Sequence, residues 1–288
     1  DKNIIVNGTL TIDPGSSINN TYTFERTRFY MQSGAKISVQ NQKTLKLTAK
    51  TALEGCTQMW NSVEMQAGSK LNMDEATIRD AWRGVNVLRT TTTLASPTLL
   101  TLNKSIFEKN YFGVYIASNS ITSDFSTLSS INKSIFDGNL SDMKPCYSGQ
   151  TNCAARANTG IYVHSATLNL GFASDETVPV QFKDLYYSGI QSFSTALSVR
   201  NTLIDKINGE DNGSYGIYQS GGTLDQQGFG FAADKKVSFR RMWYPIYVTQ
   251  ANFNIRQNRM EPDSWGIWAY KNGTTIGDIT DNYIDNKI

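Results

Sequence analysis

The 288 residues carry 27 Lys and Arg against 25 Asp and Glu, so the formal net charge at pH 7 is only +2. With 18% of residues charged, the chain lacks the concentrated basic surface of a nucleic-acid-binding protein, and we expect no nucleic acid partner. No stretch reaches the roughly 18 to 20 apolar residues that span a bilayer, so we predict no membrane insertion.

The first 55 residues consist of short alternations of apolar and polar residues separated by turns. An alternating stretch ends at Leu10 and Ile12 and is followed closely by the Pro14-Gly15 pair, which is typical of a strand and a turn. Residues 29–39 and 45–53 continue the alternation. Because period-two segments indicate β-strands, we interpret residues 1–55 as the opening coils of an all-β fold.

Residues 56–288 repeat more regularly. The segment LNMDEATIRDAWRGVNV at residues 71–87 aligns without gaps with LTLNKSIFEKNYFGVYI at residues 100–116, at an offset of 29. Gly84 and Gly113 have the same separation. A fixed period in this range indicates stacked, near-identical units, so the 288 residues correspond to about ten coils in one domain.

Two columns of apolar residues recur in the repeats, and with period two both should point into the core. The first column follows the glycine, or Pro245, of each repeat and comprises Val85, Val114, Ile161, Ile190, Ile217, Ile246 and Ile267. The second column precedes it and comprises Ile78, Phe107, Phe136, Phe182, Ile204, Phe239, Ile255 and Ile279. Three residues beyond four of these lie Asn110, Asn139, Asn258 and Asn282, which we predict at a corner in left-handed backbone conformations.

Three segments are longer than the repeat requires: residues 140–159, 208–215 and 259–265. By the alignment all three enter at the same corner. Insertions at one corner of a solenoid are expected to build a rim beside one face.

The three cysteines and the loop acids bear on compartment and metal binding. Cys146 and Cys153 lie in a short polar loop, where we predict a disulfide worth about 2 to 3 kcal/mol and hence an oxidising compartment. Cys56 is expected to be a small buried side chain. No cysteine or histidine cluster suggests zinc, and we expect no cofactor. A structural Ca²⁺ is the one metal considered, at the loop acids Asp142, Glu210, Asp211, Glu261 and Asp263.

Four sequence words resemble those of a known architecture: GTLTIDPG near the start, CTQMW before a strand, IRDAWRGV, and the recurring SIFxxN. With them the chain resembles right-handed parallel β-helix repeat proteins, and it is most similar to secreted members from Bacteroidota. The resemblance covers nearly the whole chain. It implies an all-β, right-handed, single-stranded parallel β-helix spanning residues 1–288, secretion or display on the cell surface, and a place within a longer protein. It does not specify the function, because this architecture serves lyases, hydrolases, adhesins and fibres.

The middle residue of each strand should point to solvent, and many of these residues are aromatic. The candidate binding residues are Tyr115, Tyr162, Tyr218, Tyr247 and Trp268, with His164 and Tyr270 two positions further along on the same face. Such a stripe suits stacking on sugar rings or burial of another protein's surface. Alternatively, the rings stack on one another and stiffen the sheet.

Enzyme chemistry has a weaker basis in the sequence. Glycoside hydrolysis needs paired carboxylates, and this face offers only Glu64. A metal-free β-elimination could use His164 and Tyr162 as proton-transfer groups. It would also need a cation for the substrate carboxylate, and no Arg or Lys occupies the middle positions of the strands.

We therefore expect a non-enzymatic extracellular or cell-surface module, adhesive or structural, that presents the stripe to a polysaccharide or a surface protein. The alternative is a polysaccharide lyase or glycoside hydrolase acting in the same groove. A third expectation is a subunit of a surface fibre, because exposed strand edges at the end of a solenoid favour packing against a homo-oligomeric neighbour.

Overall fold

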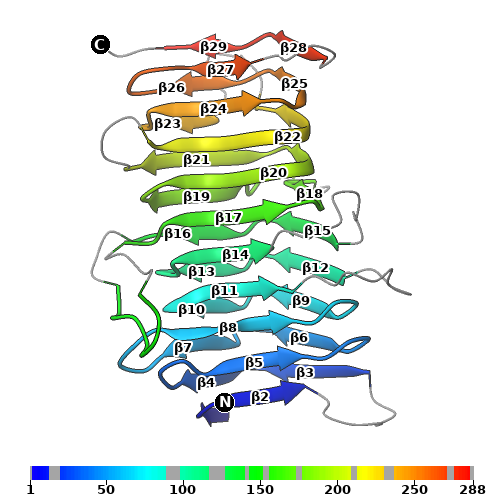
Figure 1. Cartoon of the computed structure of the whole chain (residues 1–288), viewed down its shortest axis with the longest axis vertical. Coiled ribbons are helices and arrows are strands. Elements are labelled where there is room, and N and C mark those ends of the chain that lie inside the picture. Colours follow the sequence, from blue (N-terminus) through cyan, green and yellow to red (C-terminus); the bar gives the residue numbers. More distant parts are fainter. Residues whose placement is uncertain are drawn as a thin grey trace.

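The computed structural model describes residues 2–12, 20–88, 98–116, 127–139, 143–151, 156–172, 177–208, 213–229, 237–270 and 276–285. Within these ranges every regular element is a β-strand and every strand pairing is parallel (Figure 1). No helix long and apolar enough to cross a membrane occurs in this described part of the chain. The predicted all-β, parallel β-solenoid is confirmed.

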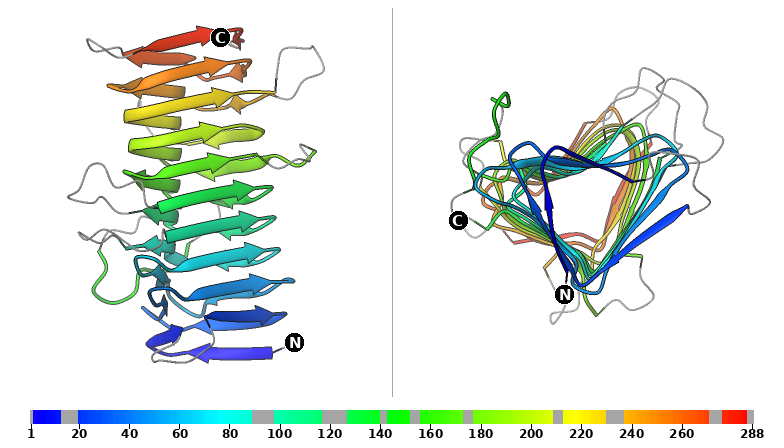
Figure 2. Two further views of the ribbon diagram at one scale, coloured as in Figure 1. Left: turned by 90° about the vertical axis from the view of Figure 1, so that its right-hand side faces the viewer. Right: turned by 90° about the horizontal axis from the view of Figure 1, so that it is seen from below.

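The strands lie on three faces, which give the coil a triangular cross-section (Figure 2). The first face stacks eleven strands: β1 (Lys2–Val6), β4 (Thr27–Met31), β7 (Ala52–Gly55), β10 (Thr77–Arg79), β13 (Ile106–Glu108), β16 (Ile135–Asp137), β19 (Val180–Leu185), β21 (Thr202–Ile207), β23 (Phe239–Arg240), β26 (Arg259–Glu261) and β29 (Tyr283–Ile284). In Figure 1 the chain rises from the N-terminus at the bottom, and its near strands run from left to right, so the coil is right-handed.

The other two faces share one continuous sheet that bends at a corner. The second face comprises β2 (Thr9–Ile12), β5 (Lys36–Val39), β8 (Trp60–Met65), β11 (Ala81–Val87), β14 (Phe112–Ile116), β17 (Thr159–His164), β24 (Tyr244–Thr249) and β27 (Ile267–Tyr270). The third comprises β3 (Thr21–Glu25), β6 (Thr44–Thr48), β9 (Lys70–Asp74), β12 (Thr98–Asn103), β15 (Thr127–Asn132), β18 (Thr167–Leu170), β25 (Asn252–Arg256) and β28 (Gly277–Thr280). Two long strands, β20 (Ser188–Val199) and β22 (Tyr215–Gln227), run through the corner and belong to both faces.

The interior is built on a ladder of large side chains from the first face. Phe107 and Phe136 stack with ring centroids 4.9 Å apart, and Phe136 and Phe182 with centroids 4.7 Å apart. The first six predicted members of this second column pair in register and are at most 2% exposed. The last two, Ile255 and Ile279, were assigned wrongly: they lie on β25 and β28 of the third face.

The ladder continues instead through Met260 and Ile284. The assignment was wrong because the coils differ in length, and because Ile255 matched the Phe and Ile residues of the column better than Met260 did. The correction also removes one predicted insertion. Residues 259–265 begin with strand β26, and six positions separate Met260 from Gly266, as six separate Phe107 from Gly113.

The repeated glycine of the second face exists because of this ladder. A Cβ added to Gly113 would lie 2.6 Å from the Phe136 ring and 2.5 Å from the carbonyl oxygen of Gly160. A Cβ on Gly160 would lie 2.5 Å from the Phe182 ring. Each glycine therefore leaves the space that the aromatic ring of the next coil fills.

The corner asparagines act differently from the prediction. Of the four, only Asn139 has a positive φ, whereas the left-handed residue is otherwise the one before, such as Lys109 or Asp281. Asn110, 3% exposed, accepts a hydrogen bond from the Ala81 amide at 2.9 Å and donates to the Ile78 carbonyl at 3.0 Å. The side-chain amide of Asn110 thus provides hydrogen-bond partners for two backbone groups of the preceding coil. To reach them, the side chain must be buried and point inward.

One insertion returns along the solenoid. Residues 143–151, here called the strap, leave the corner after β16 and lie against earlier coils (Figure 1). The Met59 amide donates to the Pro145 carbonyl at 2.8 Å, and the Lys144 ammonium binds the Asp80 carboxylate at 2.8 Å and the Gly55 carbonyl. Residues 140–142, 152–155 and 209–212 of the predicted insertions lie outside the described residues.

Insertions are not confined to that corner, contrary to expectation. Between the second and third faces, ten residues connect β11 to β12 and ten connect β14 to β15, against four between β8 and β9. These two connections are not apparent in the sequence, because they have equal length and therefore leave the neighbouring repeats aligned without gaps at an offset of 29 residues.

We predict that Phe107→Ala lowers the free energy of unfolding by about 3 to 5 kcal/mol, because the ring is 2% exposed and stacked inside the solenoid. Ile106→Ala is the matched control, since this neighbour is 38% exposed and should cost less than about 1 kcal/mol. Chemical denaturation followed by circular dichroism measures both. Equal losses would show that burial in the ladder does not determine stability here.

Candidate functional site

The outward positions of the second face form a row of aromatic side chains in register along the solenoid axis. Strand pairing aligns Tyr115 with Tyr162, Tyr218 with Tyr247, and Tyr247 with Trp268. Between them Gln191 interrupts the row on β20. The predicted outward direction is correct, since every one of these side chains is partly exposed.

A phenylalanine that the sequence analysis missed bridges this interruption. Phe193 pairs with His164 in the neighbouring column, and its ring centroid lies 5.5 Å from that of Tyr162 and 5.7 Å from that of Tyr218. The rings therefore form one unbroken series, which we call the aromatic stripe: Tyr115, Tyr162, Phe193, Tyr218, Tyr247 and Trp268.

The rings of the stripe stack on one another. Centroids lie 4.7 Å apart for Tyr115 and Tyr162, 5.3 Å for Tyr218 and Tyr247, and 6.1 Å for Tyr247 and Trp268, with interplanar angles of 9°, 4° and 2°. These spacings follow from the distance between paired strands. Tyr247 thus has a stacked ring on both faces, whereas Tyr162 and Tyr218 each have one stacked ring and the tilted ring of Phe193 as a second neighbour. These inner rings therefore offer mainly their edges to solvent.

A second aromatic row flanks the C-terminal half of the stripe. Tyr215 and Tyr244 stack with centroids 5.4 Å apart, and Tyr244 and Trp265 with centroids 6.5 Å apart. This row was not predicted, because only the middle residue of the strand segment that follows each column glycine was considered as an outward position. The available signal was the residue immediately before Gly216, Pro245 and Gly266, which is aromatic each time.

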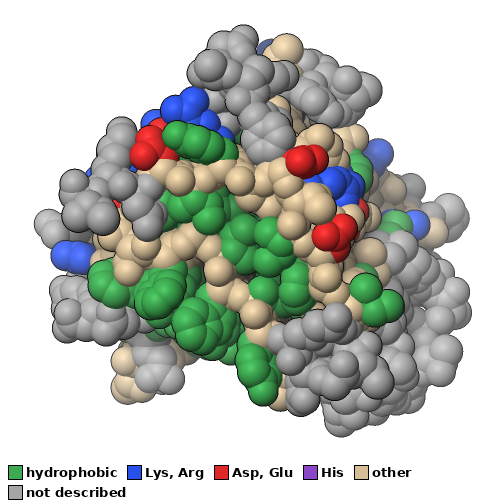
Figure 3. All heavy atoms as spheres, turned by 90° about the horizontal axis from the view of Figure 1, so that it is seen from above, with side chains coloured by type: hydrophobic (Ala, Val, Ile, Leu, Met, Phe, Trp, Pro, Cys, Tyr) green, Lys and Arg blue, Asp and Glu red, His purple; other side chains and the backbone are tan. Residues whose placement is uncertain are grey.

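Among the aromatic residues of this face, the most exposed lie at its C-terminal end. Trp265, Trp268 and Tyr270 are 48%, 42% and 56% exposed. Seen from the C-terminal end, apolar side chains gather across the middle of the molecule (Figure 3). Here aromatic ring surface is open to a partner, in contrast to the inner rings. Packing of this end against a neighbouring subunit, as in a fibre, stays a prediction.

The phenol groups are held in their protonated form. Burial is the main cause that raises the pKa of Tyr162 and Tyr218, and neighbouring phenols add to it. For Tyr215, burial and the surrounding tyrosines raise the pKa to about 12. At neutral pH these side chains are hydrogen-bond donors along the face and poor proton acceptors.

The proposed proton-transfer pair, His164 and Tyr162, lies among a hydroxyl and aromatic rings. The Nδ1 atom of His164 lies 2.8 Å from the hydroxyl of Ser165, and its ring stacks on Phe193 with centroids 5.9 Å apart. Because burial raises the pKa of Tyr162, its phenolate is disfavoured as a base. The structure brings both residues onto one face, as predicted, among aromatic neighbours.

The one carboxylate among the described strand residues of this face is already bound. Glu64 accepts hydrogen bonds from Lys36 at 3.0 and 3.1 Å and from Gln66 at 3.2 Å. Among the acids considered for Ca²⁺, Glu261 lies 3.6 Å from Arg259, while Asp142, Glu210 and Asp211 lie outside the described residues. No group of three or more potential metal ligands gathers within the described ranges.

A cation that the sequence analysis missed lies at the N-terminal end of the stripe. Arg83 faces outward on β11, in register with Phe112 of β14. Its guanidinium carbon lies 3.7 Å from the ring centroid of Tyr115 and 3.9 Å from that of Trp82. Arg83 immediately precedes Gly84, just as the residues of the second aromatic row immediately precede Gly216, Pro245 and Gly266. It was not predicted, because only positions after the glycine were considered.

The cysteines are partly described. Cys146, in the strap, is disulfide-bonded, and its predicted partner Cys153 lies outside the described residues, so their pairing stays a prediction. Cys56 is a free thiol of intermediate exposure, which contradicts the expected full burial. Its sulfur accepts a hydrogen bond from the side-chain amide nitrogen (Nε2) of Gln32 at 3.4 Å.

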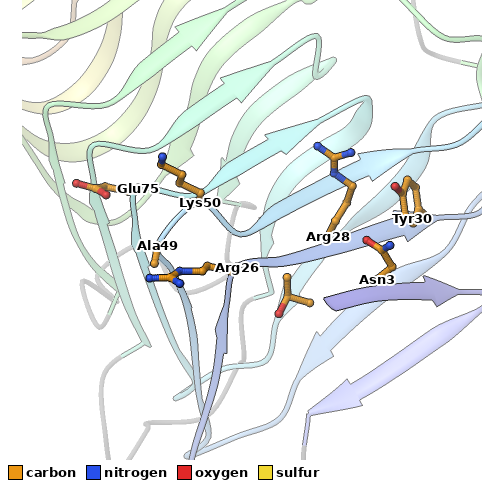
Figure 4. Close-up of a pocket in the computed structure, with 8 residues that line it drawn as sticks. Asn3, Arg26, Arg28, Tyr30, Ala49, Lys50 and Glu75 are labelled. Atoms are coloured by element: carbon orange, nitrogen blue, oxygen red, sulfur yellow. The ribbon is translucent and has the colours of Figure 1, made fainter. Parts of the chain in front are cut away.

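A separate polar hollow of about 750 Å³ lies on the first face near the N-terminus (Figure 4). Arg26, Arg28 and Lys50 line it together with Asn3 and Glu75. Arg28 lies 3.5 Å from Glu54, which partly neutralises it. The sequence analysis missed this hollow because its residues come from successive coils with no shared motif.

Comparison with protein families, curated proteins and solved structures found no match to this chain. The resemblance to secreted proteins of Bacteroidota therefore stays a sequence-based prediction.

We predict that Tyr215→Phe reduces the loss of stability at alkaline pH. The folded-state pKa of about 12 exceeds the ordinary value of 10.0, so the folded protein keeps a proton that the unfolded chain releases between these values. The tyrosine's contribution is complete below about pH 10 and is lost as the pH rises through about 12. Denaturation at several pH values should give a flatter profile for the variant; coincident profiles would contradict the assignment.

The cysteines give a second test. Mass spectrometry of unreduced digests should show the Cys146 and Cys153 peptides linked, while the half-exposed Cys56 should react with iodoacetamide without denaturant. Finding both loop thiols free in protein from its native source would remove the argument for an oxidising compartment.

Proposed function

We propose that this protein is a non-enzymatic module, secreted or displayed on a cell surface, that binds a polysaccharide along its aromatic stripe. The observation that supports the proposal best is the unbroken aromatic series from Tyr115 to Trp268 on one flat face. Large, rigid aromatic side chains lose little conformational entropy on binding and are common in recognition surfaces.

The two parts of the stripe offer different contacts to a sugar chain. At the C-terminal end, Trp265, Trp268 and Tyr270 expose enough ring surface for the apolar face of a pyranose to stack on them. Along the inner part, tyrosine edges supply apolar contact and protonated hydroxyls for the sugar hydroxyls. A linear polymer along the solenoid axis meets one aromatic ring of the stripe at each coil from Tyr115 to Trp268.

The competing proposal of a lyase or hydrolase is less favoured by the same geometry. Glu64 is paired with Lys36, so the described part of this face offers no pair of carboxylates for glycoside hydrolysis, and burial raises the pKa of Tyr162, which disfavours its phenolate as a base.

Secretion is supported by one observation of the structure. Cys146 is disulfide-bonded, and stable disulfides belong to oxidising compartments. The resemblance to secreted β-helix proteins of Bacteroidota is a sequence-based prediction in the same direction. A rigid solenoid suits a spacer or adhesive element, because its length grows with the number of coils.

We predict that Trp268→Ala weakens polysaccharide binding by roughly 1 to 3 kcal/mol. The unfolding free energy should change by less than about 1 kcal/mol, because the side chain is 42% exposed and its ring contacts among the described residues are with Tyr247 and Trp265. Phe172→Ala is the matched control, since Phe172 is 50% exposed and lies off the stripe. Isothermal titration with oligosaccharides of cellulose, xylan and polygalacturonate measures the effect.

Two outcomes would contradict the proposal. If none of a broad panel of polysaccharides binds the unaltered protein, the stripe has another role, such as docking a protein or stiffening the sheet. If the unaltered protein releases unsaturated sugars, seen as new ultraviolet absorbance, and His164→Ala abolishes the release, the protein is a lyase.

A further inference from the structure

The guanidinium of Arg83 is fixed between aromatic rings. Its carbon lies 3.9 Å from the Trp82 centroid and 3.7 Å from the Tyr115 centroid, so it covers the end of the aromatic stripe. Its Nη1 donates to the Asn86 side-chain oxygen at 3.1 Å. These three contacts hold the plane of the guanidinium in one orientation.

This arginine has unused hydrogen-bonding capacity. A guanidinium carries five N–H donors, and among the described residues Arg83 makes one hydrogen bond and no ion pair. Its Nε is buried without a partner. Most other arginines of the described chain, such as Arg28, Arg241 and Arg256, lie within 4 Å of a carboxylate.

The surroundings of Arg83 favour an anion. Burial lowers the pKa of its guanidinium, and the groups that act on it electrostatically are the phenols of Tyr115, Tyr147 and Tyr162. The acid of the neighbouring coil, Glu64, is held by Lys36. A partly desolvated cation without a carboxylate partner gains more from binding an anion than an exposed one does.

We propose that Arg83 is an anion-binding subsite of the aromatic stripe and takes the carboxylate or sulfate group of an acidic glycan. The inference rests on the proposed function, since it names the class of polysaccharide that the stripe binds. A repeating polymer fits better than an acidic peptide, because the rings recur at centroid spacings between 4.7 and 6.1 Å and a polymer of like units meets each of them alike.

The test compares an acidic glycan with its neutral counterpart. Oligogalacturonate and heparin-derived oligosaccharides supply carboxylate and sulfate, and carboxyl-reduced oligogalacturonate is the neutral probe. Arg83→Gln should weaken binding of at least one acidic probe about tenfold or more and leave the neutral probe unchanged. Arg83→Lys should fall between the two, because it keeps the charge and loses the planar fork. Lys46→Gln, on the third face, is the charge-matched control and should have no effect.

The outcomes separate the subsite from the function. Equal binding of acidic and neutral probes by the unaltered protein, or equal losses for both in Arg83→Gln, would overturn the subsite and leave the glycan-binding function standing. Tighter binding of poly-glutamate than of the acidic glycans would make the partner an acidic protein and overturn the proposal.

If no glycan binds the unaltered protein, the proposed function fails, and the arginine can still be tested alone. Titration with sulfate and with galacturonate should shift the Nε–H signal of Arg83 in the nuclear magnetic resonance spectrum, assigned by its loss in Arg83→Lys. An unchanged signal at saturating anion would overturn the subsite. Because the lysine variant keeps the charge and the aliphatic stem, it keeps the comparison valid if Arg83→Gln does not fold.

Discussion

The contact between the glycine column and the phenylalanine ladder determines the rest of this structure. The rings of Phe107, Phe136, Phe182 and Phe239 fill the spaces that missing Cβ atoms leave on the second face, as Phe136 does beside Gly113. This fit fixes how successive coils lie over one another. A slip of one residue would move every side chain to the opposite side of its strand, so the interior contact also decides what points outward.

The aromatic stripe is a consequence of that register. Once Val114 and Ile161 are stacked inside, Tyr115 and Tyr162 must stack outside, at the distance between paired strands. The same rule brings Arg83 against Tyr115, from two coils whose outward residues differ in chemistry. The packing of the core thus determines which side chains lie next to one another on the outer face. On the second face, Arg83 marks the boundary between a polar N-terminal part and an aromatic C-terminal part.

The sequence predicted the fold, the glycine column and most of the stripe, because these features repeat with the period of the coil. It failed where a residue's role depends on a neighbour in another column. Phe193 belongs to the stripe because its ring lies between those of Tyr162 and Tyr218, although its backbone pairs with His164 in the next column, and Arg83 belongs to it because Tyr115 lies beside it. Ile255 was misplaced because no alignment of single coils shows that a methionine continues an aromatic ladder.

The strap of residues 143–151 changes how such a molecule responds to a pulling force. A solenoid whose coils touch only their neighbours can be peeled apart one coil at a time. Here Pro145 is bonded to Met59, and Lys144 to Asp80, so a segment that follows β16 holds the edges of much earlier coils. Peeling from the N-terminus must detach this segment when it reaches the coil that contains Gly55 and Met59. Several coils therefore resist tension together, as one mechanical unit.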